Sequence, residues 1–185
     1  MINNISFKAT FVDKVNIKTL NESGEYVDKQ VSFVKRNPYS QLDYDSIVEI
    51  GNQWGGKNYV HSMLHHSDII KDDEKREVFL ITEQTDNFRK IVPEKVLGMI
   101  EITKHKGYNK INYLQTQPNS AFENKSRKNK GVGYAMLVMA EKLANGKDII
   151  LHAKISALDF YKKFGFVVTY DKCKNPKMLL RGVKG

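Results

Sequence analysis

The junction at residues 111–143 restricts the fold most, because a strand pattern there passes into a helix pattern through a pair of glycines. Residues 111–116 are expected to form a strand, residues 119–130 are polar, and the helix that follows opens at Gly131 and Gly133. The start of a helix carries unpaired N–H groups and partial positive charge, and glycines let a ligand approach that backbone closely. The junction is therefore suited to bind an anion, and phosphate is the usual one.

Downstream of this junction the chain alternates between strand and helix patterns. Asn145-Gly146 ends the long helix with a left-handed cap signal. A strand, a short helix, a strand and an edge strand are then expected at 148–153, 157–164, 166–170 and 178–180. Counted from the strand at 111–116, this is a β-α-β-α-β order, which is typical of a mixed sheet.

The part of the chain before the junction predicts a hairpin, two helices and further strands. Alternating apolar residues over 6–34 predict an N-terminal β-hairpin. The segment 43–70 looks helical, with Asp43 or Asp45 as its cap, and Gly55-Gly56 divides it into two short helices. Two strands that pair mostly antiparallel with the strand of the junction are expected at 78–82 and 96–102.

These elements predict a single α/β domain over residues 1–185, with a mixed sheet. A length of 185 residues suits one domain, and 41% hydrophobic with 28% charged residues is a globular composition. The single cysteine, Cys173, excludes an intramolecular disulfide and fits a reducing, cytoplasmic location. No apolar stretch approaches the roughly 18–20 residues of a membrane span, so no membrane partner is expected.

The chain is basic, and part of its positive charge lies directly before the glycine pair. It contains 30 Lys and Arg against 21 Asp and Glu, which gives a net charge of +9. This balance favours a polyanionic partner, such as a nucleic acid or a phosphorylated cofactor, although a merely solvated basic surface is the alternative. Four cations stand just upstream of Gly131: Lys125, Arg127, Lys128 and Lys130.

Two common phosphate-binding motifs are absent from the junction. A Walker loop requires Gly-Lys-Ser/Thr, which does not occur, and Met136 stands where a dinucleotide fingerprint needs its third glycine. By themselves, Gly131 and Gly133 are also compatible with a role limited to close helix–sheet packing.

Three segments, in order, resemble motifs of the GNAT superfamily of N-acetyltransferases. Residues 128–133, Lys-Asn-Lys-Gly-Val-Gly, resemble the acetyl-CoA pyrophosphate loop, and residues 114–118 resemble the strand that pairs with the pantetheine arm. Residues 157–166 resemble the family's Ala-x-x-Phe-Tyr-x-x-x-Gly-Phe segment. The resemblance covers about residues 78–180 and implies a GNAT-like acyl-CoA N-acyltransferase fold.

The resemblance also implies an activity and a cofactor site. The expected enzyme transfers an acetyl group from acetyl-CoA, its co-substrate, directly to a primary amine in a ternary complex, without a metal. The residues expected to bind the cofactor lie on the strand, on the loop and at the helix start: Leu114, Gln115, Thr116, Lys128, Asn129, Lys130, Gly131, Val132, Gly133 and Tyr134.

Three positions depart from the family pattern. Lys128 stands where the family has Arg or Gln and keeps the charge. The loop from Pro118 to Lys128 is longer than in typical members and is expected to form a flap beside the cofactor. Lys154 replaces a common Asn, so a hydrogen bond to the pantetheine arm is expected to be missing or replaced.

Acetyl transfer also needs an acid for the departing thiolate and a base for the amine. The resemblance assigns the acid role to Tyr161, and the alternative for this residue is packing or ordering of the cofactor sulfur. Glu101 is the candidate base, with an ordered water as the alternative. Cys173 is not expected to be a covalent nucleophile.

Further histidines and aromatic residues of the two short helices are candidates for other roles. His61 and His65 have the spacing of metal ligands, but Ser62 follows His61, so the His-Glu-x-x-His motif is absent. With His66, they are expected at the surface or along an acceptor pocket. Trp54 and Tyr59 are candidates for the wall of that pocket, and core packing is the alternative for Trp54.

The sequence leaves the acceptor and two other functions open. The acceptor amine belongs to a small molecule, a peptide or a protein, with an amine linked to a nucleic acid as a further option. A basic nucleic-acid-binding module and a CoA-binding protein without catalysis are the competing functions. A homodimer formed through exposed edge strands also stays open.

Overall fold

The N-terminal alternation of apolar and polar residues produces the expected hairpin, β1 (Thr10–Leu20) and β2 (Tyr26–Lys35). Val15 and Ile17 are buried on one face, whereas Lys14, Asn16 and Lys18, which alternate with them, are exposed. Gly24, in the turn, has a φ of 78°, which favours glycine. The computed structural model describes residues 8–55, 59–67, 75–120, 127–172 and 174–182.

All strands of the described chain belong to one sheet. Its nine strands have the order β6-β1-β2-β3-β4-β5-β7-β9-β8. The remaining strands are β3 (Lys75–Thr82), β4 (Val96–Lys104), β5 (Tyr108–Thr116), β6 (Asn129–Lys130), β7 (Asp148–His152), β8 (Val167–Tyr170) and β9 (Lys177–Leu180). Every neighbouring pair is antiparallel except β5 and β7, which run parallel.

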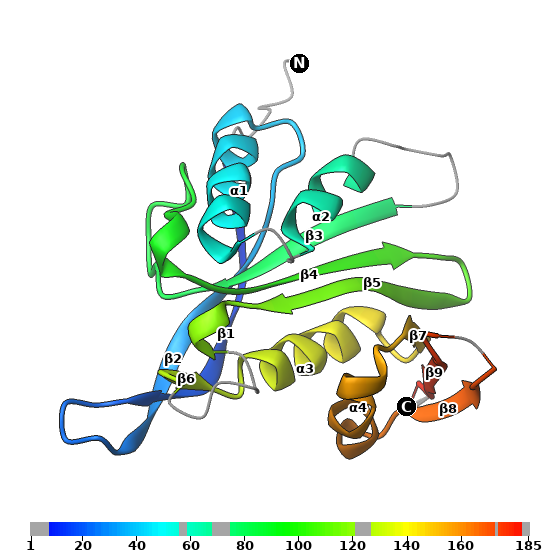
Figure 1. Ribbon diagram of the computed structural model, residues 1–185. Helices are drawn as coiled ribbons and strands as arrows, with labels where there is room; N and C mark the ends of the chain where they lie inside the picture. Colours follow the sequence, from blue (N-terminus) through cyan, green and yellow to red (C-terminus); the bar gives the residue numbers. More distant parts are fainter. Residues whose placement is uncertain (1–7, 56–58, 68–74, 121–126, 173, 183–185) are drawn as a thin grey trace.

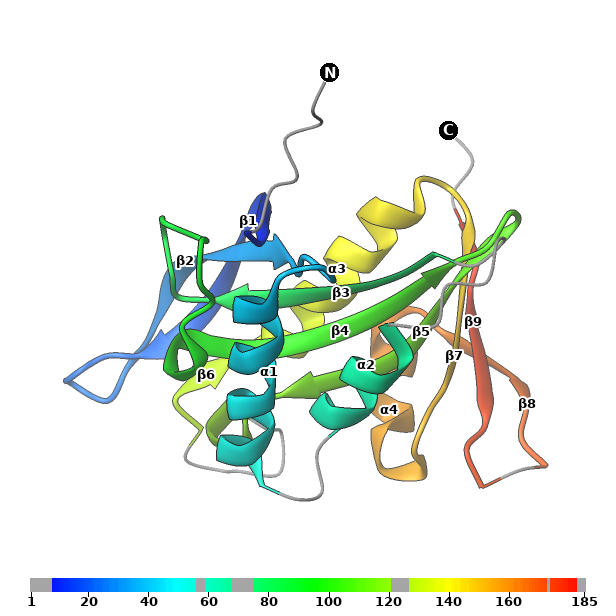
Figure 2. The same cartoon turned by 90° about the horizontal axis from the view of Figure 1, so that it is seen from above.

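Helices lie on both faces of this sheet (Figures 1 and 2). The helices α1 (Gln41–Trp54) and α2 (Val60–Ser67) pack on one face, and α3 (Val132–Ala144) packs on the other. The helix α4 (Leu158–Phe164) follows β7. Short 3-10 turns occur at Pro93–Lys95, Pro118–Ser120 and Ile155–Ala157.

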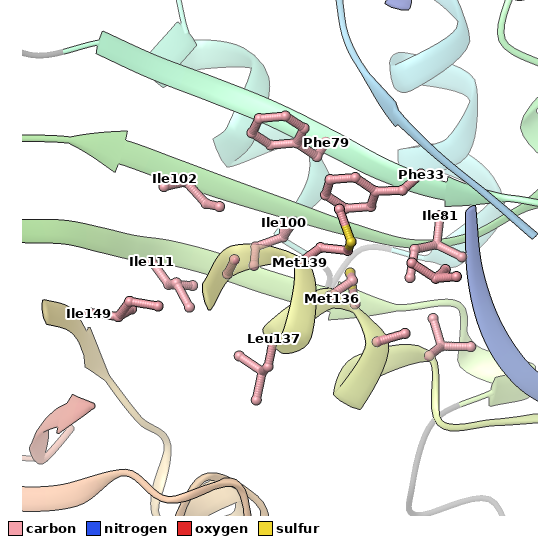
Figure 3. Packing of buried hydrophobic residues seen from close by; sticks show 14 of the residues in the cluster. Phe33, Phe79, Ile81, Ile100, Ile102, Ile111, Met136, Leu137, Met139 and Ile149 are labelled. Atoms are coloured by element: carbon pink, nitrogen blue, oxygen red, sulfur yellow. The ribbon is translucent and has the colours of Figure 1, made fainter. Parts of the chain in front are cut away.

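The larger core lies between the sheet and α3 (Figure 3). Phe33 and Phe79 stack there with ring centroids 5.2 Å apart, and Met136 and Met139 of α3 fill the space below them. Gly98 of β4 allows α3 to approach closely, because a Cβ at this position would lie 2.8 Å from the side chains of Val132 and Met136. A glycine in the middle of a strand therefore sets how near α3 stands to the sheet.

The structure confirms the predicted mixed α/β architecture and corrects details of it. The cap of α1 is Ser40, whose Oγ accepts the Asp43 N–H at 3.2 Å, so neither Asp43 nor Asp45 caps the helix. Asp43 is instead fully buried and accepts the Asn37 N–H at 2.9 Å. The short strand β6 was not expected, because two residues carry no periodic signal.

Among the helices in the described part of the chain, none combines the length and the hydropathy that crossing a lipid bilayer requires.

Candidate functional site

The splay between β5 and β7 opens the sheet next to the start of α3. Their register ends at Ile111 and Leu151, whereas β5 continues to Thr116 and β7 ends at His152. Asn112 forms a bulge at the same point, because Glu101 of β4 faces Tyr113 and Ile102 faces Ile111. Beyond this bulge, the backbone of β5 no longer pairs with β7.

The first turn of α3, which we call the cradle, has the backbone geometry that suits an anion-binding site. Gly131 precedes the helix with a φ of 83°, and a Cβ on it would meet open space. The first backbone bond of the helix runs from the Ala135 N–H to the Gly131 carbonyl at 2.8 Å, so the N–H groups of the three residues between them have no helical acceptor. The first turn contains no acidic residue. These features suit a phosphate group.

The β1–β2 hairpin holds the loop before this cradle from the other side. Strand β6 pairs with β1, with Lys130 opposite Lys18, and the Leu20 N–H donates to the Lys128 carbonyl at 2.9 Å. The Tyr26 hydroxyl donates to the Arg127 carbonyl at 2.6 Å. The Lys130 Nζ lies 3.4 Å from the centroid of the Tyr26 ring. The backbone of the loop is thus anchored on the hairpin.

The three segments singled out in the sequence meet at Gly133. A Cβ on this residue would lie 3.2 Å from the Phe160 Cζ and 3.8 Å from the Thr116 Cγ2. The end of β5, the start of α3 and the helix α4 are therefore in contact at one point. The Tyr134 ring packs edge-on against Phe164, with centroids 5.1 Å apart.

The structure locates the remaining residues expected at the cofactor. Leu114 packs partly against the α3-side core, and the Gln115 side chain donates to the Thr116 carbonyl at 3.1 Å. Asn129 is buried, Lys128 is exposed, and Val132 is buried in the core. The side chains of this group thus point in different directions, and what they share is the backbone around the α3 start.

Tyr161 lies half-buried among the aromatic rings of α4 and of Phe166, which directly precedes β8 (Val167–Tyr170). Its centroid is 5.1 Å from that of Phe160 and 5.7 Å from that of Phe166. Burial, together with the neighbouring Tyr59, raises the pKa of Tyr161 to about 12. The phenol is protonated at neutral pH, as an exposed tyrosine also is, and the raised pKa makes it a weaker acid.

Glu101 is completely buried in the middle of β4. Its Oε1 accepts the Asn112 Nδ2 at 2.7 Å, and the same Nδ2 donates to the Thr103 Oγ1 at 2.6 Å. The Oε2 is buried without a hydrogen-bond partner among the described residues. Burial raises the pKa of Glu101, although the Asn112 bond and the charges of Arg76, Lys110 and Arg36 pull it down.

An aromatic wall connects Tyr161 with the second helix. The Tyr59 and Tyr113 centroids are 5.1 Å apart, and the Lys154 Nζ lies 4.7 Å from the Tyr59 centroid. Trp54, by contrast, is buried in the core under α1 and α2. The His61 ring packs against α1, where a Cβ on Gly51 would come within 2.7 Å of it.

No group of three or more potential metal ligands occurs in the part of the chain that the structure describes. Lys125, Cys173 and the side chains of His65 and His66 lie outside the described residues.

Sequence reasoning missed the contribution of the hairpin and of the bulge. Tyr26 is separated from Arg127 by 101 positions, and no local pattern connects them. The bulge at Asn112 was not predicted either, because it is defined by the pairing of β5 with β4. The residues that Tyr26 and Asn112 contact can be identified only once the strand register is known.

The comparisons support the fold that these elements define. No family model and no curated protein matches the sequence. The solved PaiA N-acetyltransferase of Thermoplasma acidophilum, in complex with coenzyme A, matches 82% of this chain and 98% of its own at a TM-score of 0.52 and 14% identity. An Escherichia coli ribosomal-protein-S18-alanine N-acetyltransferase matches 84% and 96% at a TM-score of 0.54 and 12% identity.

A Pseudomonas aeruginosa acyl-CoA N-acyltransferase matches 83% of this chain and 99% of its own at a TM-score of 0.51 and 11% identity. The chain therefore has the fold of the GNAT-type acyl-CoA N-acyltransferases, as the three motifs predict.

Proposed function

We propose that the protein is an N-acetyltransferase that uses acetyl-CoA and a primary amine. The observation that carries this proposal is the contact at Gly133, which joins the splayed strand, the anion cradle and the helix of Tyr161. The cradle fits the diphosphate of coenzyme A, since it offers free backbone N–H groups, open space at Gly131 and no acidic residue. When bound, acetyl-CoA supplies an acetyl group activated as a thioester.

The residues of this chain would divide the remaining work. The first turn of α3 and the edge of β5 beyond Ile111 bind and orient the co-substrate. Tyr161, which is protonated at neutral pH, holds the proton that a leaving thiolate requires, and the developing negative charge of the thiolate has to draw it from a phenol of raised pKa. Glu101 is fully buried, so it would accept the proton of the amine through an ordered water rather than directly.

A thermal-shift measurement tests the cofactor part of this proposal. Acetyl-CoA at 100 times its Kd is expected to stabilise the protein by about 2.7 kcal/mol, which raises Tm by several degrees in a domain of this size. NADH and ATP at the same concentration serve as controls for unspecific phosphate binding. An unchanged Tm at millimolar acetyl-CoA would contradict the proposal. Stabilisation without any acyl transfer would favour a non-catalytic CoA-binding protein.

The contact between Tyr26 and the cofactor loop leads to a second prediction. Tyr26→Phe removes the hydroxyl bond to Arg127 but keeps the ring under Lys130, and Tyr26→Leu removes both. We expect acetyl-CoA affinity to fall about fivefold in the first variant and about 30-fold in the second, because each contact contributes roughly 1 kcal/mol. Calorimetric titration measures both, with Tyr39→Phe, an exposed tyrosine elsewhere, as control.

Equal affinity in Tyr26→Leu and in the unmodified protein would show that the hairpin does not position the loop.

A further inference from the structure

A strip of basic side chains crosses the sheet on the face opposite α3, beside Glu101. Lys110 of β5 lies between Thr103 of β4 and Ile150 of β7, and His152 of β7 lies opposite Lys177 of β9. These residues share one face because their neighbours in sequence, among them Ile111, Leu151 and Met178, point into the core on the α3 side. We call Lys110, His152 and Lys177 the basic strip.

The two lysines of the strip are half-buried, yet neither pairs with an acidic group of the described chain. On the strands β4, β5, β7 and β9, two carboxylates lie on the same face as the strip, Glu101 and Asp148. Glu101 is bonded to Asn112, and Asp148 is bonded to Arg181 at 2.8 Å and to the Gly182 N–H at 2.9 Å. Neither carboxylate is bonded to a lysine of the strip, although Glu101 is close enough to Lys110 for the lysine charge to lower its pKa.

The charges of Lys110 and Lys177 lower the pKa values of neighbouring groups. Burial, followed by Lys110 and Lys177, lowers the pKa of His152, so its imidazole is neutral at pH 7. Lys110 is also one of the cations that lower the pKa of Glu101, so the strip adjoins the candidate base. Partly buried cations without a partner are unfavourable, and an anion bound between them would relieve that cost.

The spacing of the sheet limits the size of such a ligand. Thr103, the partner of Lys110, is two residues from Glu101 on the same strand, which is about 7 Å, and adjacent strands are about 4.8 Å apart. An anion on the strip is thus within the length of a small molecule from an amine at the Glu101 end. The Lys154 Nζ, over the Tyr59 ring, adds a further cation toward Tyr161.

We propose that the acceptor of this enzyme is a small primary amine that also carries a carboxylate or a phosphate, and that this anionic group binds between Lys110 and Lys177 beside His152. The inference rests on the proposed acetyltransferase function and names the substrate class of that site. The neutral imidazole of His152 supplies a further hydrogen bond to the anionic group.

Matched pairs of amines that differ only in the anionic group test this assignment. L-Phenylalanine is compared with phenethylamine, and O-phosphoethanolamine with ethanolamine, so that carboxylate and phosphate are examined separately. We expect the anionic member of at least one pair to be acetylated with about tenfold or higher kcat/KM, measured by thiol release. In the presence of CoA, only that member is expected to raise Tm.

The double variant Lys110→Gln, Lys177→Gln shows whether the strip causes the preference. It is expected to reduce the preference about tenfold or more, with both members of each pair measured on the same variant so that a general effect through Glu101 cancels in the ratio. The stabilisation by acetyl-CoA is expected to stay unchanged. Lys90→Gln, an exposed lysine in the loop between β3 and β4, is the matched control. Because stabilisation by acetyl-CoA is measured separately, failure of the proposed function is recognised independently of the acceptor.

Several results would overturn the inference. The first is an equal kcat/KM for both members of each pair, and the second is a preference for the anionic amine that persists in the double variant. The third is that none of the amines is acetylated although acetyl-CoA binds. Salt-dependent binding of single-stranded RNA that the double variant abolishes would instead assign the strip to a nucleic acid.

Discussion

Gly131→Glu is expected to abolish the stabilisation of the protein by acetyl-CoA while leaving the fold intact. The new side chain would enter open space, so it causes no clash. Its carboxylate would lie at the start of α3, where it repels a diphosphate and competes for the same N–H groups. We expect the affinity for acetyl-CoA, measured by calorimetry, to fall by about 100-fold or more, since a charged hydrogen-bonding site is lost.

Gly24→Glu is the matched control for this substitution. Gly24 has a φ of 78°, close to the 83° of Gly131, and a Cβ on it also meets open space. Both variants are therefore expected to lose a similar amount of stability, about 1–2 kcal/mol, from the left-handed backbone conformation. Only Gly131→Glu is expected to lose affinity for acetyl-CoA. Tight binding by the Gly131 variant would show that the α3 start is not the diphosphate site.

Tyr161→Phe is expected to lower turnover about 100-fold with little change in the affinity for acetyl-CoA. The phenylalanine keeps the contacts with Phe160 and Phe166, so packing is preserved, but the proton for the leaving thiolate is lost. Steady-state kinetics with thiol detection measure kcat, and calorimetry measures binding. Tyr170→Phe, an exposed tyrosine on β8, is the control. Equal kcat in the Tyr161 variant and the unmodified protein would remove the acid role.

The pKa of Tyr161 adds a pH signature. A phenol whose pKa is raised from 10.0 to about 12 in the folded state stays protonated where an exposed tyrosine already ionises. Its contribution to stability is complete below pH 10 and is lost as the pH rises from there through about 12. The unmodified protein is therefore expected to lose stability more steeply than Tyr161→Phe above pH 10, as measured by urea unfolding.

Local patterns were sufficient for most of the elements. The alternation in 6–34, the glycine pair at the start of α3 and the Asn145-Gly146 end of that helix each depend on a few neighbouring residues. They could be predicted because backbone geometry and local burial decide them. Capping was predicted less well, since Ser40 and Asp43 are both good caps and only the position of the turn decides between them.

Local patterns in the sequence were enough to predict the order of the elements and the helix start at Gly131, and the likeness of three segments to one acetyltransferase fold predicted the fold that the structure shows. The tertiary structure was needed to show which distant residues meet: Tyr26 with Arg127, Asn112 with Glu101, and Lys110 with His152 and Lys177 on one face. Those contacts depend on strand register and on a bulge, and a shift of one residue would turn each side chain to the opposite face. No local property of the chain reports such long-range pairing.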